Sequence, residues 1–316
     1  MSSNELDLSE LVFRSLQAAV DAVPADGTLR ETVQWFVSRD WAGKQKTWPF
    51  ASLPLLAGQA AGDQINQATV GVAAAWNLFH LAAHILDDVE DGDVLNGPAG
   101  PLAAPEAINV ATTLIFLAQY TFESQAEGAA GQLRPPLYQM LLQMCAGQHR
   151  DLTGPAADLE TYWQIVQCKS GHFFGWACEA GAILAGGDAV QVERSRAYGY
   201  HLGVLLQISD DLEGFIAAGE RSDLAAAKYT LPTLYALSVL SPGQPALLPV
   251  LLAEAGQNRT AEDAARAEIV RLGGLHYALV QAEIYRWQAA AAVSALPDSP
   301  ARQQLLALLE TAFPIQ

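Results

Sequence analysis

Two acidic clusters stand out in a chain in which only 16% of the residues are charged. The first follows an apolar stretch that starts at Trp76, and it consists of Asp87, Asp88, Glu90, Asp91 and Asp93. On a helix, Asp87 and Asp91 lie one turn apart on the same face, where their carboxylates repel each other unless a cation lies between them. Mg²⁺ prefers such oxygen ligands, and acid at the C-terminus of a helix opposes the helix dipole. The pattern therefore favours a divalent-metal site over the alternative of a solvated helix end.

The second cluster has the same form, an apolar run that ends in carboxylates. It contains Asp210, Asp211 and Glu213. The residue one turn after Asp210 is Gly214, so no stacked pair forms there, and Glu213 with its longer side chain is the expected substitute. If both clusters face one cavity, their carboxylates line its mouth from opposite walls. That arrangement could hold several Mg²⁺ ions that bridge a diphosphate.

Two lysines are candidate ligands for such an anion. Lys169 lies in an apolar, aromatic segment, and Lys228 follows the second acidic cluster. A lone lysine on an apolar helix commonly extends its ammonium group to the surface. The residues alone therefore leave two interpretations open for each lysine, a ligand of an anion or an ordinary surface residue.

Composition narrows the class of protein. The chain has 316 residues, 51% of them hydrophobic, which is enough for a large core. Ala and Leu dominate and β-branched runs are scarce, which indicates helices. The net charge of −17 argues against a nucleic-acid surface. The three cysteines lack paired spacing, and we find no cationic leader and no apolar run of membrane-spanning length, so we expect a reduced, soluble, cytoplasmic protein.

Apolar residues recur at helical spacing between glycines and prolines along the whole chain. The expected helices cover residues 8–23, 29–37, 54–62, 67–90, 104–126, 136–152, 158–186, 189–218 and 231–240, with several more before the C-terminus. We find no alternating strand pattern of useful length and no linker rich in Pro, Gly or Ser. The sequence therefore predicts a single all-α domain over residues 1–316.

Taken in order, these residues resemble the motifs of the trans-isoprenyl diphosphate synthases, the polyprenyl synthetase family. The family pattern DDxxD matches Asp87, Asp88 and Asp91, and FQxxDDxxD is similar to the segment from Gln207 to Asp211. Further matches are the GQxxDL-like segment at residues 147–152, the K-T/S-like pair Lys169-Ser170 and the SDLxxGKxTLP-like segment at residues 222–232. One match alone is weak, whereas the ordered set over about residues 43–240 is specific.

The resemblance implies an isoprenoid-synthase helical bundle around a deep apolar cavity, with an allylic prenyl diphosphate as substrate. It implies that Mg²⁺ is held by Asp87, Asp88, Asp91, Asp210, Asp211 and Glu213. Lys169 and Lys228 would bind the diphosphate, and the other substrate contacts would include Gln148 and Gln207. The ring faces of Phe173 or Phe174 could stabilise an allylic cation, with ordinary core packing as the alternative.

Residues on the helix before the first acidic cluster bear on the substrate as well. His80 matches a family histidine that serves the same site, and a core histidine is the alternative. Ala82 and Ala83 occupy positions where bulky side chains close the pocket in family members that make short products. Their small size predicts a C15 to C20 or longer chain, with Trp76 or Phe79 as the floor of the pocket.

The half of the site that would bind isopentenyl diphosphate departs from the family. This chain has Asn96, Gly97 and Pro98 where the family has Arg-Arg-Gly, and only Lys44 and Lys46 remain of the family pattern GKxxRP. Asn replaces Arg poorly at a bidentate phosphate contact.

Three functions therefore stay open. The favoured one is a prenyltransferase that condenses isopentenyl diphosphate with an allylic diphosphate. The second is a terpene synthase that acts on the allylic diphosphate alone, and the third is a non-catalytic subunit that pairs with an active synthase. The retained acidic and lysine residues argue against the third. The resemblance also implies a homodimer.

Overall fold

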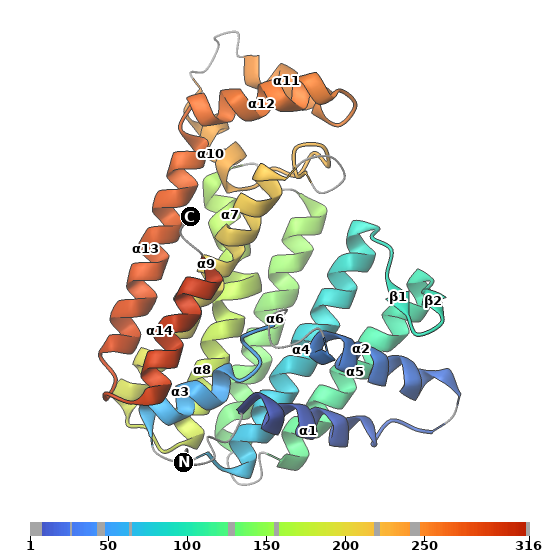
Figure 1. Cartoon of the computed structure of the whole chain (residues 1–316), viewed down its shortest axis with the longest axis vertical. Coiled ribbons are helices and arrows are strands. Elements are labelled where there is room, and N and C mark those ends of the chain that lie inside the picture. The colour runs from blue at the N-terminus through green and yellow to red at the C-terminus, as the bar shows by residue number, and fades with distance from the viewer. Residues whose placement is uncertain are drawn as a thin grey trace, which may run out of the picture. The chain divides into compact units, whose positions relative to one another are not determined.

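The chain is helical almost throughout (Figure 1). The computed structural model describes residues 8–25, 27–42, 48–62, 65–125, 130–154, 158–217, 222–240 and 247–313. Its helices are α1 (Leu8–Val20), α2 (Thr28–Ala42), α3 (Leu53–Ala61), α4 (Gln67–Asp91), α5 (Ala104–Gln125), α6 (Ala130–Thr153), α7 (Leu159–Val166), η1 (Gln167–Gly171, a π-helix), α8 (His172–Leu184), α9 (Ala189–Ile216), α10 (Leu231–Ser238), α11 (Leu247–Ala255), α12 (Arg259–Arg271), α13 (Gly274–Ser294) and α14 (Pro300–Ala312). A small antiparallel hairpin of β1 (Asn96–Gly97) and β2 (Gly100–Pro101) pairs Asn96 with Pro101.

The chain packs as two compact units. The first unit comprises residues 1–136, 177–196 and 294–308, and the second comprises residues 137–176, 197–293 and 309–316. The first acidic cluster belongs to the first unit and the second cluster to the second unit. The single-domain organisation stays a prediction.

Helix α4 is the central element of the first unit, and it runs beside α5. The side chain of Asn66 caps its start by accepting the Thr69 N–H at 2.9 Å. Gly92, at φ 79° in the left-handed region, ends it directly after the acidic cluster. By length and composition α4 could cross a membrane, but 78% of its most apolar window is buried in the protein, which is typical of a core helix.

Glycines allow α3 and α8 to approach closely within the first unit. A Cβ atom at Gly181 would lie 1.9 Å from the carbonyl oxygen of Pro54, and one at Gly58 would lie 2.9 Å from the carbonyl oxygen of Gly181. No side chain fits at such a backbone contact. The contact therefore fixes the C-terminal part of α8 against α3.

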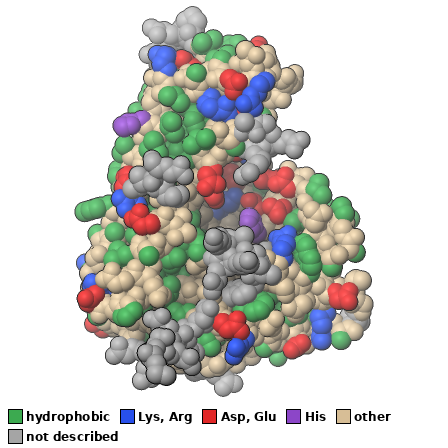
Figure 2. Space-filling view, in the orientation of Figure 1, with side chains coloured by type: hydrophobic (Ala, Val, Ile, Leu, Met, Phe, Trp, Pro, Cys, Tyr) green, Lys and Arg blue, Asp and Glu red, His purple; other side chains and the backbone are tan. Residues whose placement is uncertain are grey.

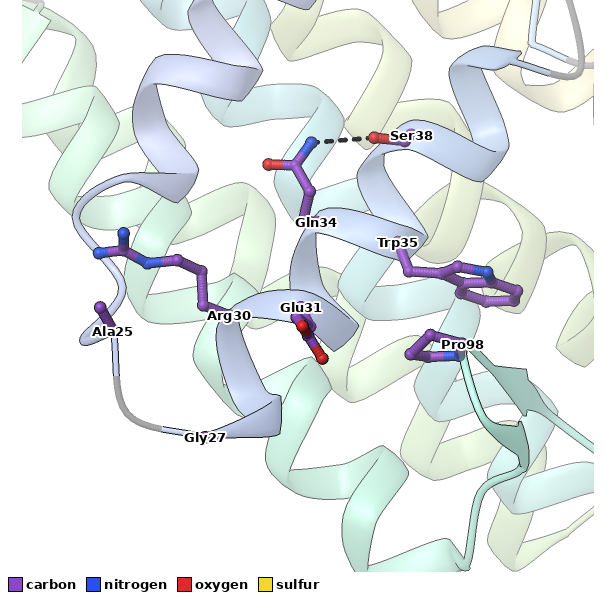
Figure 3. Close-up of a pocket in the computed structure, with 8 residues that line it drawn as sticks. All are labelled: Ala25, Gly27, Arg30, Glu31, Gln34, Trp35, Ser38 and Pro98. Atoms are coloured by element: carbon purple, nitrogen blue, oxygen red, sulfur yellow. Dashed lines mark hydrogen bonds between the residues drawn. The ribbon is translucent and has the colours of Figure 1, made fainter.

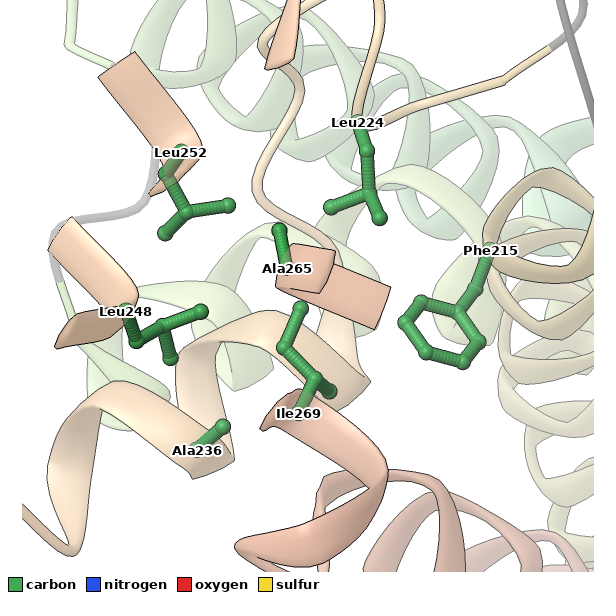
Figure 4. Close-up of a cluster of buried hydrophobic side chains, with 7 residues drawn as sticks. All are labelled: Phe215, Leu224, Ala236, Leu248, Leu252, Ala265 and Ile269. Atoms are coloured by element: carbon green, nitrogen blue, oxygen red, sulfur yellow. The ribbon is translucent and has the colours of Figure 1, made fainter. Parts of the chain in front are cut away.

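A cluster of buried apolar side chains forms part of the core of the second unit (Figure 4). It joins the end of α9 to α10, α11, α12 and the segment before α10 through Phe215, Leu224, Ala236, Leu248, Leu252, Ala265 and Ile269. Each of these side chains is at most 3% exposed, so burial of their apolar surface stabilises the end of α9.

The structure confirms the all-α prediction and most of the expected helix positions. Two details differ. Helix α6 begins at Ala130, six residues before the expected start, and it tolerates Pro135 and Pro136 near its N-terminal end although each lacks a backbone donor. The expected helix over residues 158–186 is interrupted by η1, which contains Lys169.

Candidate active site

The first acidic cluster lies at the C-terminal end of α4, where acidic side chains gather on the surface (Figure 2). Asp87 and Asp88 are half-buried and Asp91 is exposed. Burial raises the pKa of Asp88, and the charges of Asp93 and Asp87 raise it further, while His84 and Arg39 act in the opposite direction. A carboxyl group with a raised pKa among other acids is a site at which a cation is favoured.

His80 lies about two turns before these acids, packed against an aromatic residue. The ring of Trp48 stacks on the His80 imidazole with 3.7 Å between centroids, and the Trp48 Nε1–H donates to Asn77 Oδ1 at 3.0 Å. Burial lowers the pKa of His80 to about 3, and the charge of His84 lowers it further. The imidazole is therefore neutral at pH 7, and it can offer a hydrogen bond to a substrate but no positive charge.

The neutral state of His80 predicts a pH dependence of stability. An unfolded chain binds a proton at this residue below pH 6.5, whereas the folded protein does so only near pH 3. The stabilising contribution is therefore complete above pH 6.5 and is lost as the pH falls. We expect the free energy of unfolding to fall by about 1–2 kcal/mol more between pH 7 and pH 5 than it does in His80→Phe. Urea titrations measure this difference.

His276→Gln is the matched control, because that histidine is exposed on α13. This variant should keep the pH dependence of the wild type. An equal pH dependence in His80→Phe and the wild type would contradict the assignment of a neutral, buried imidazole.

The second acidic cluster divides into exposed and buried members. Asp210 and Glu213 are exposed on α9. Asp211 is 5% exposed, and its Oδ2 accepts the Tyr162 hydroxyl at 2.7 Å and the Leu231 N–H at 3.0 Å. Burial raises the pKa of Asp211 to about 7, against the opposing effect of these hydrogen bonds.

This placement of Asp211 differs from its predicted role as a metal ligand. Its oxygens are occupied inside the protein, where they connect α9 to α7 and to the start of α10. Adjacent residues on a helix point about 100° apart, so an exposed Asp210 places Asp211 toward the interior. Tyr162 was not among the residues that the sequence suggested. Its spacing of seven residues from Lys169, two helical turns, was the only available signal.

The two predicted motif residues Lys169 and Ser170 lie in the π-helix η1. Lys169 Nζ forms an ion pair with Asp151 Oδ2 at 2.8 Å, and Ser170 Oγ donates to Gln207 Oε1 at 3.1 Å. The Nε2 of Gln207 in turn contacts Asp211 Oδ1 at 3.4 Å. A π-helical turn inside an α-helix commonly marks a functional position. Here the lysine of one motif pairs with the aspartate of the GQxxDL-like segment, which lies on α6.

The remaining candidate substrate-binding residues of the second unit lie in different environments. Gln148 is half-buried on α6, next to Gly147, whose lack of a side chain allows contact with Cys168 and Lys169. Phe173 and Phe174 are 3% and 6% exposed and contact each other edge to face at 5.8 Å. Their burial is typical of core residues, so a role toward a cation stays a prediction.

Lys228 is exposed directly before α10. The residue before it, Ala227, has φ 55°, a left-handed conformation that glycine adopts without strain and alanine does not. The family pattern has glycine at this position. The Lys228 N–H donates to the Asp223 carbonyl at 2.8 Å, so this turn fixes where the lysine backbone lies.

The acceptor half of the predicted site is only partly described. Lys44 and Lys46 lie outside the described residues. Asn96 is exposed on β1, and Gly97 is buried, where a Cβ atom would lie 3.0 Å from the Leu102 side chain. On α4, Ala82 and Phe79 are buried at 1% and 4% exposure and Ala83 is half-buried.

A surface pocket of about 570 Å³ in the first unit contains none of the predicted site residues. Figure 3 shows that Trp35 of α2 and Pro98 of the hairpin form one side of it, while Arg30 points away from them. The Arg30 guanidinium donates to the carbonyl oxygens of Val23 and Asp21 and so helps to fix the chain after α1. This pocket is not the candidate site for a diphosphate, because the guanidinium of Arg30 already binds backbone carbonyls.

Mg²⁺ fits the donors that the structure offers. They are carboxylate oxygens at two helix ends, the ligands that Mg²⁺ prefers. Among the described residues, no three His, Cys, Asp or Glu side chains are placed to hold a metal ion by themselves. Mg²⁺ keeps several waters and commonly binds through one or two carboxylates together with substrate phosphates.

Known proteins provide an independent comparison. The family model named polyprenyl synthetase matches residues 51–269. The chain is 30% identical over 286 residues to geranylgeranyl diphosphate synthase of Mycobacterium tuberculosis (strain ATCC 25618 / H37Rv), which covers 84% of this chain and 79% of that protein. It is 29% identical over 272 residues to octaprenyl diphosphate synthase of Escherichia coli (strain K12), with coverage of 82% and 83%.

The fold agrees with this comparison. The crystal structure of geranylgeranyl pyrophosphate synthetase from Pyrococcus horikoshii Ot3 matches with a TM-score of 0.84 at 20% identity, covering 98% of this chain and 96% of that chain. The fold is that of the all-α isoprenoid synthases. The chain belongs to the polyprenyl synthetase family.

Proposed function

We propose that this protein is a soluble, cytoplasmic, Mg²⁺-dependent prenyltransferase that ionises an allylic prenyl diphosphate and condenses it with isopentenyl diphosphate. The principal support is the pair of carboxylate-bearing helix ends, on α4 and α9, in a member of the polyprenyl synthetase family. Relatives named geranylgeranyl and octaprenyl diphosphate synthase favour a linear product. Small residues at positions 82 and 83 favour a C15 to C20 or longer chain.

The chain's own residues would have separate tasks. Asp87, Asp88, Asp91, Asp210 and Glu213 would hold Mg²⁺. When bound, the ion neutralises the negative charge that develops on a departing diphosphate.

Lys169 and Lys228 would bind the diphosphate oxygens as point charges. The ion pair between Lys169 and Asp151 holds the ammonium group in place before the substrate arrives. Gln207, bonded to Ser170, would keep η1 and α9 in register. Buried apolar residues of α4 would exclude water from the prenyl chain.

A homodimer is supported by an apolar stripe on α5. Ile108, Phe116 and Tyr120 are 46%, 64% and 58% exposed, and their spacing of eight and four residues places them on one face of the helix. Single exposed apolar residues are common, whereas a row of them on one helix face is typical of an interface.

A second function, that of a terpene synthase, is favoured by the hairpin. Asn96 and Gly97 stand where the family has two arginines. Asn96 carries no charge, and an Arg side chain at position 97 would have to displace Leu102. Both positions therefore lack the bidentate cation that would bind a second diphosphate. An enzyme of this kind would ionise the allylic diphosphate and release a hydrocarbon or alcohol.

Product analysis separates the candidates. We would incubate the purified protein and Mg²⁺ with geranyl, farnesyl and geranylgeranyl diphosphates, with and without isopentenyl diphosphate. Longer diphosphates that form only with isopentenyl diphosphate would support the prenyltransferase. Hydrocarbons or alcohols without it would instead support the terpene synthase, and inactivity in both cases until a second chain is added would support a partner subunit.

A further inference from the structure

Trp48 lies before α3 in the first unit, and three aromatic side chains contact its ring. The ring stacks on the His80 imidazole with 3.7 Å between centroids and 23° between planes. The Trp76 ring is stacked with it at 6.0 Å, and the Phe50 ring meets it edge to face at 5.4 Å. Stacked and edge-to-face contacts of this kind are favourable, so together they hold the indole in one position.

A buried amide fixes the orientation of the same ring. The Trp48 Nε1–H donates to Asn77 Oδ1 at 3.0 Å. Asn77 is 8% exposed, and its Nδ2 donates to the carbonyl oxygens of Ala51 at 2.9 Å and Ala73 at 2.7 Å. Loss of a partner would leave a buried polar atom unsatisfied, which is costly. The indole N–H is therefore committed to α4.

The stacked pair lies on the face of α4 that carries the first acidic cluster. His80 precedes Asp87 by seven residues, or two helical turns, so their side chains share one face of the helix. Along the helix axis they are about 10 Å apart. The Trp48 ring thus forms a surface beside the position at which this cluster would hold a metal–diphosphate.

The place of Trp48 in the sequence is informative as well. It directly precedes Pro49, and in the family pattern GKxxRP the residue directly before the proline is an arginine. The guanidinium of arginine offers five N–H donors in a planar fork that matches a phosphate. An indole offers one N–H and no charge, and here Asn77 accepts that N–H.

The neighbours that fix Trp48 add no positive charge at pH 7. Trp76 and Phe50 are apolar, and Asn77 is a neutral amide. Burial lowers the pKa of His80 to about 3, so its imidazole is neutral. A diphosphate that approaches this surface loses hydration and gains no ion pair in return. The stack therefore disfavours a phosphorylated ligand at a place where an arginine would favour one.

We propose that Trp48 is a specificity-determining residue on the acceptor side of the site: stacked on His80 in place of an arginine, it weakens the binding of isopentenyl diphosphate. This inference rests on the proposed function, because it concerns the second substrate of that reaction. The allylic diphosphate is unaffected, since the acidic clusters and lysines would bind it. Restoring the arginine should therefore strengthen the binding of one substrate and leave the other unchanged.

Trp48→Arg provides the test. Isopentenyl diphosphate would be titrated by calorimetry into protein already saturated with Mg²⁺ and a non-ionisable thio analogue of geranyl diphosphate. The analogue fills the allylic site, and the readout does not depend on turnover. We expect the Kd for isopentenyl diphosphate to fall at least about tenfold, the size of effect that one bidentate charge-assisted contact supplies. The Kd of the analogue itself should stay within about twofold of the wild type.

The new arginine has partners that should keep the variant folded. Its guanidinium could donate to Asn77 Oδ1 and lie over the Trp76 ring, a favourable cation–π arrangement. Melting curves without ligands check this. Raising NaCl from about 50 mM to about 500 mM should reduce the gain in affinity, because salt screens a charge–charge contact. A gain that came only from repacking would not respond to salt.

Two control variants separate the charge from the loss of the indole. Trp48→Phe keeps a ring beside His80 and adds no cation, so it should bind isopentenyl diphosphate as the wild type does. Trp287→Arg makes the same exchange on α13, where the tryptophan is 70% exposed, and it should also leave this binding unchanged.

The outcomes distinguish this inference from the proposed function. An unchanged Kd in folded Trp48→Arg, or an equal gain in Trp48→Phe, would overturn the role of Trp48, while longer diphosphates made by the wild type would still support the prenyltransferase. Tighter, salt-sensitive binding in Trp48→Arg supports the inference. If that gain is seen although the wild type makes no longer diphosphate, the proposed function fails and the role of Trp48 stands.

Discussion

Replacing Asp87 with Asn should lower the rate of allylic diphosphate ionisation by at least about a hundredfold, the size of effect seen when one preorganised electrostatic contact to a developing charge is removed. The amide has nearly the same shape as the carboxylate but carries no charge, so it is a poor ligand for a hard cation. Asp87 is half-buried at the end of α4, where its negative charge also opposes the helix dipole. Removing that charge should not destabilise the fold, and kcat should fall more than the melting temperature.

Steady-state kinetics with geranyl diphosphate and isopentenyl diphosphate, at saturating Mg²⁺, measure this loss. Glu106→Gln is the matched control, because it removes an exposed acid from the first turn of α5 in the same unit. We expect its kcat within about twofold of the wild type, since surface substitutions of this kind have small effects. Equal rates for Asp87→Asn and Glu106→Gln would remove the first acidic cluster from the mechanism.

The position of this cluster could be predicted from the sequence because its signals are local. Apolar residues at helical spacing define α4, Asn66 starts it, and Gly92 ends it directly after the acids. The same kind of pattern predicts α9 and its terminal carboxylates. Residue types and their spacing within one helix are sufficient for such inferences.

Three features could not be predicted, because each depends on contacts between residues far apart in the chain. The inward orientation of Asp211 requires the N–H of Leu231, twenty residues later. The close contact of the Asp223 carboxylate with Gly214 requires the turn before α10. The π-helical turn at Lys169 adds one residue to a pattern that reads as a continuous α-helix.

The structure also shows that the two hairpin positions without the family arginines differ in their surroundings. From the sequence, Asn96 and Gly97 are only two missing arginines. In the structure, Asn96 is exposed and open to replacement, while Gly97 is packed against Leu102. An arginine could thus be restored at position 96 but not at position 97 without repacking, so the two losses differ in how easily they could be reversed.

The buried carboxylate of Asp211 leads to the largest expected effect on stability. Asp211→Ala leaves the Tyr162 hydroxyl and the Leu231 N–H without their acceptor in the protein interior. Breaking such a buried network by removing one partner costs about 3–5 kcal/mol. We expect urea unfolding to show a loss of this size, because α7, α9 and the start of α10 are all connected through this one side chain.

Two further variants separate the charge of Asp211 from its hydrogen bonds. Asp211→Asn keeps one acceptor oxygen that both donors can reach, so it should lose much less stability than Asp211→Ala. Tyr162→Phe removes a single hydrogen bond and should cost about 1–2 kcal/mol. Glu160→Ala, an exposed change on α7, should stay within about 0.5 kcal/mol of the wild type. If Asp211→Ala is as stable as Glu160→Ala but loses Mg²⁺ binding, Asp211 is a metal ligand, as its place in the motif first suggests, and not the interior contact described above.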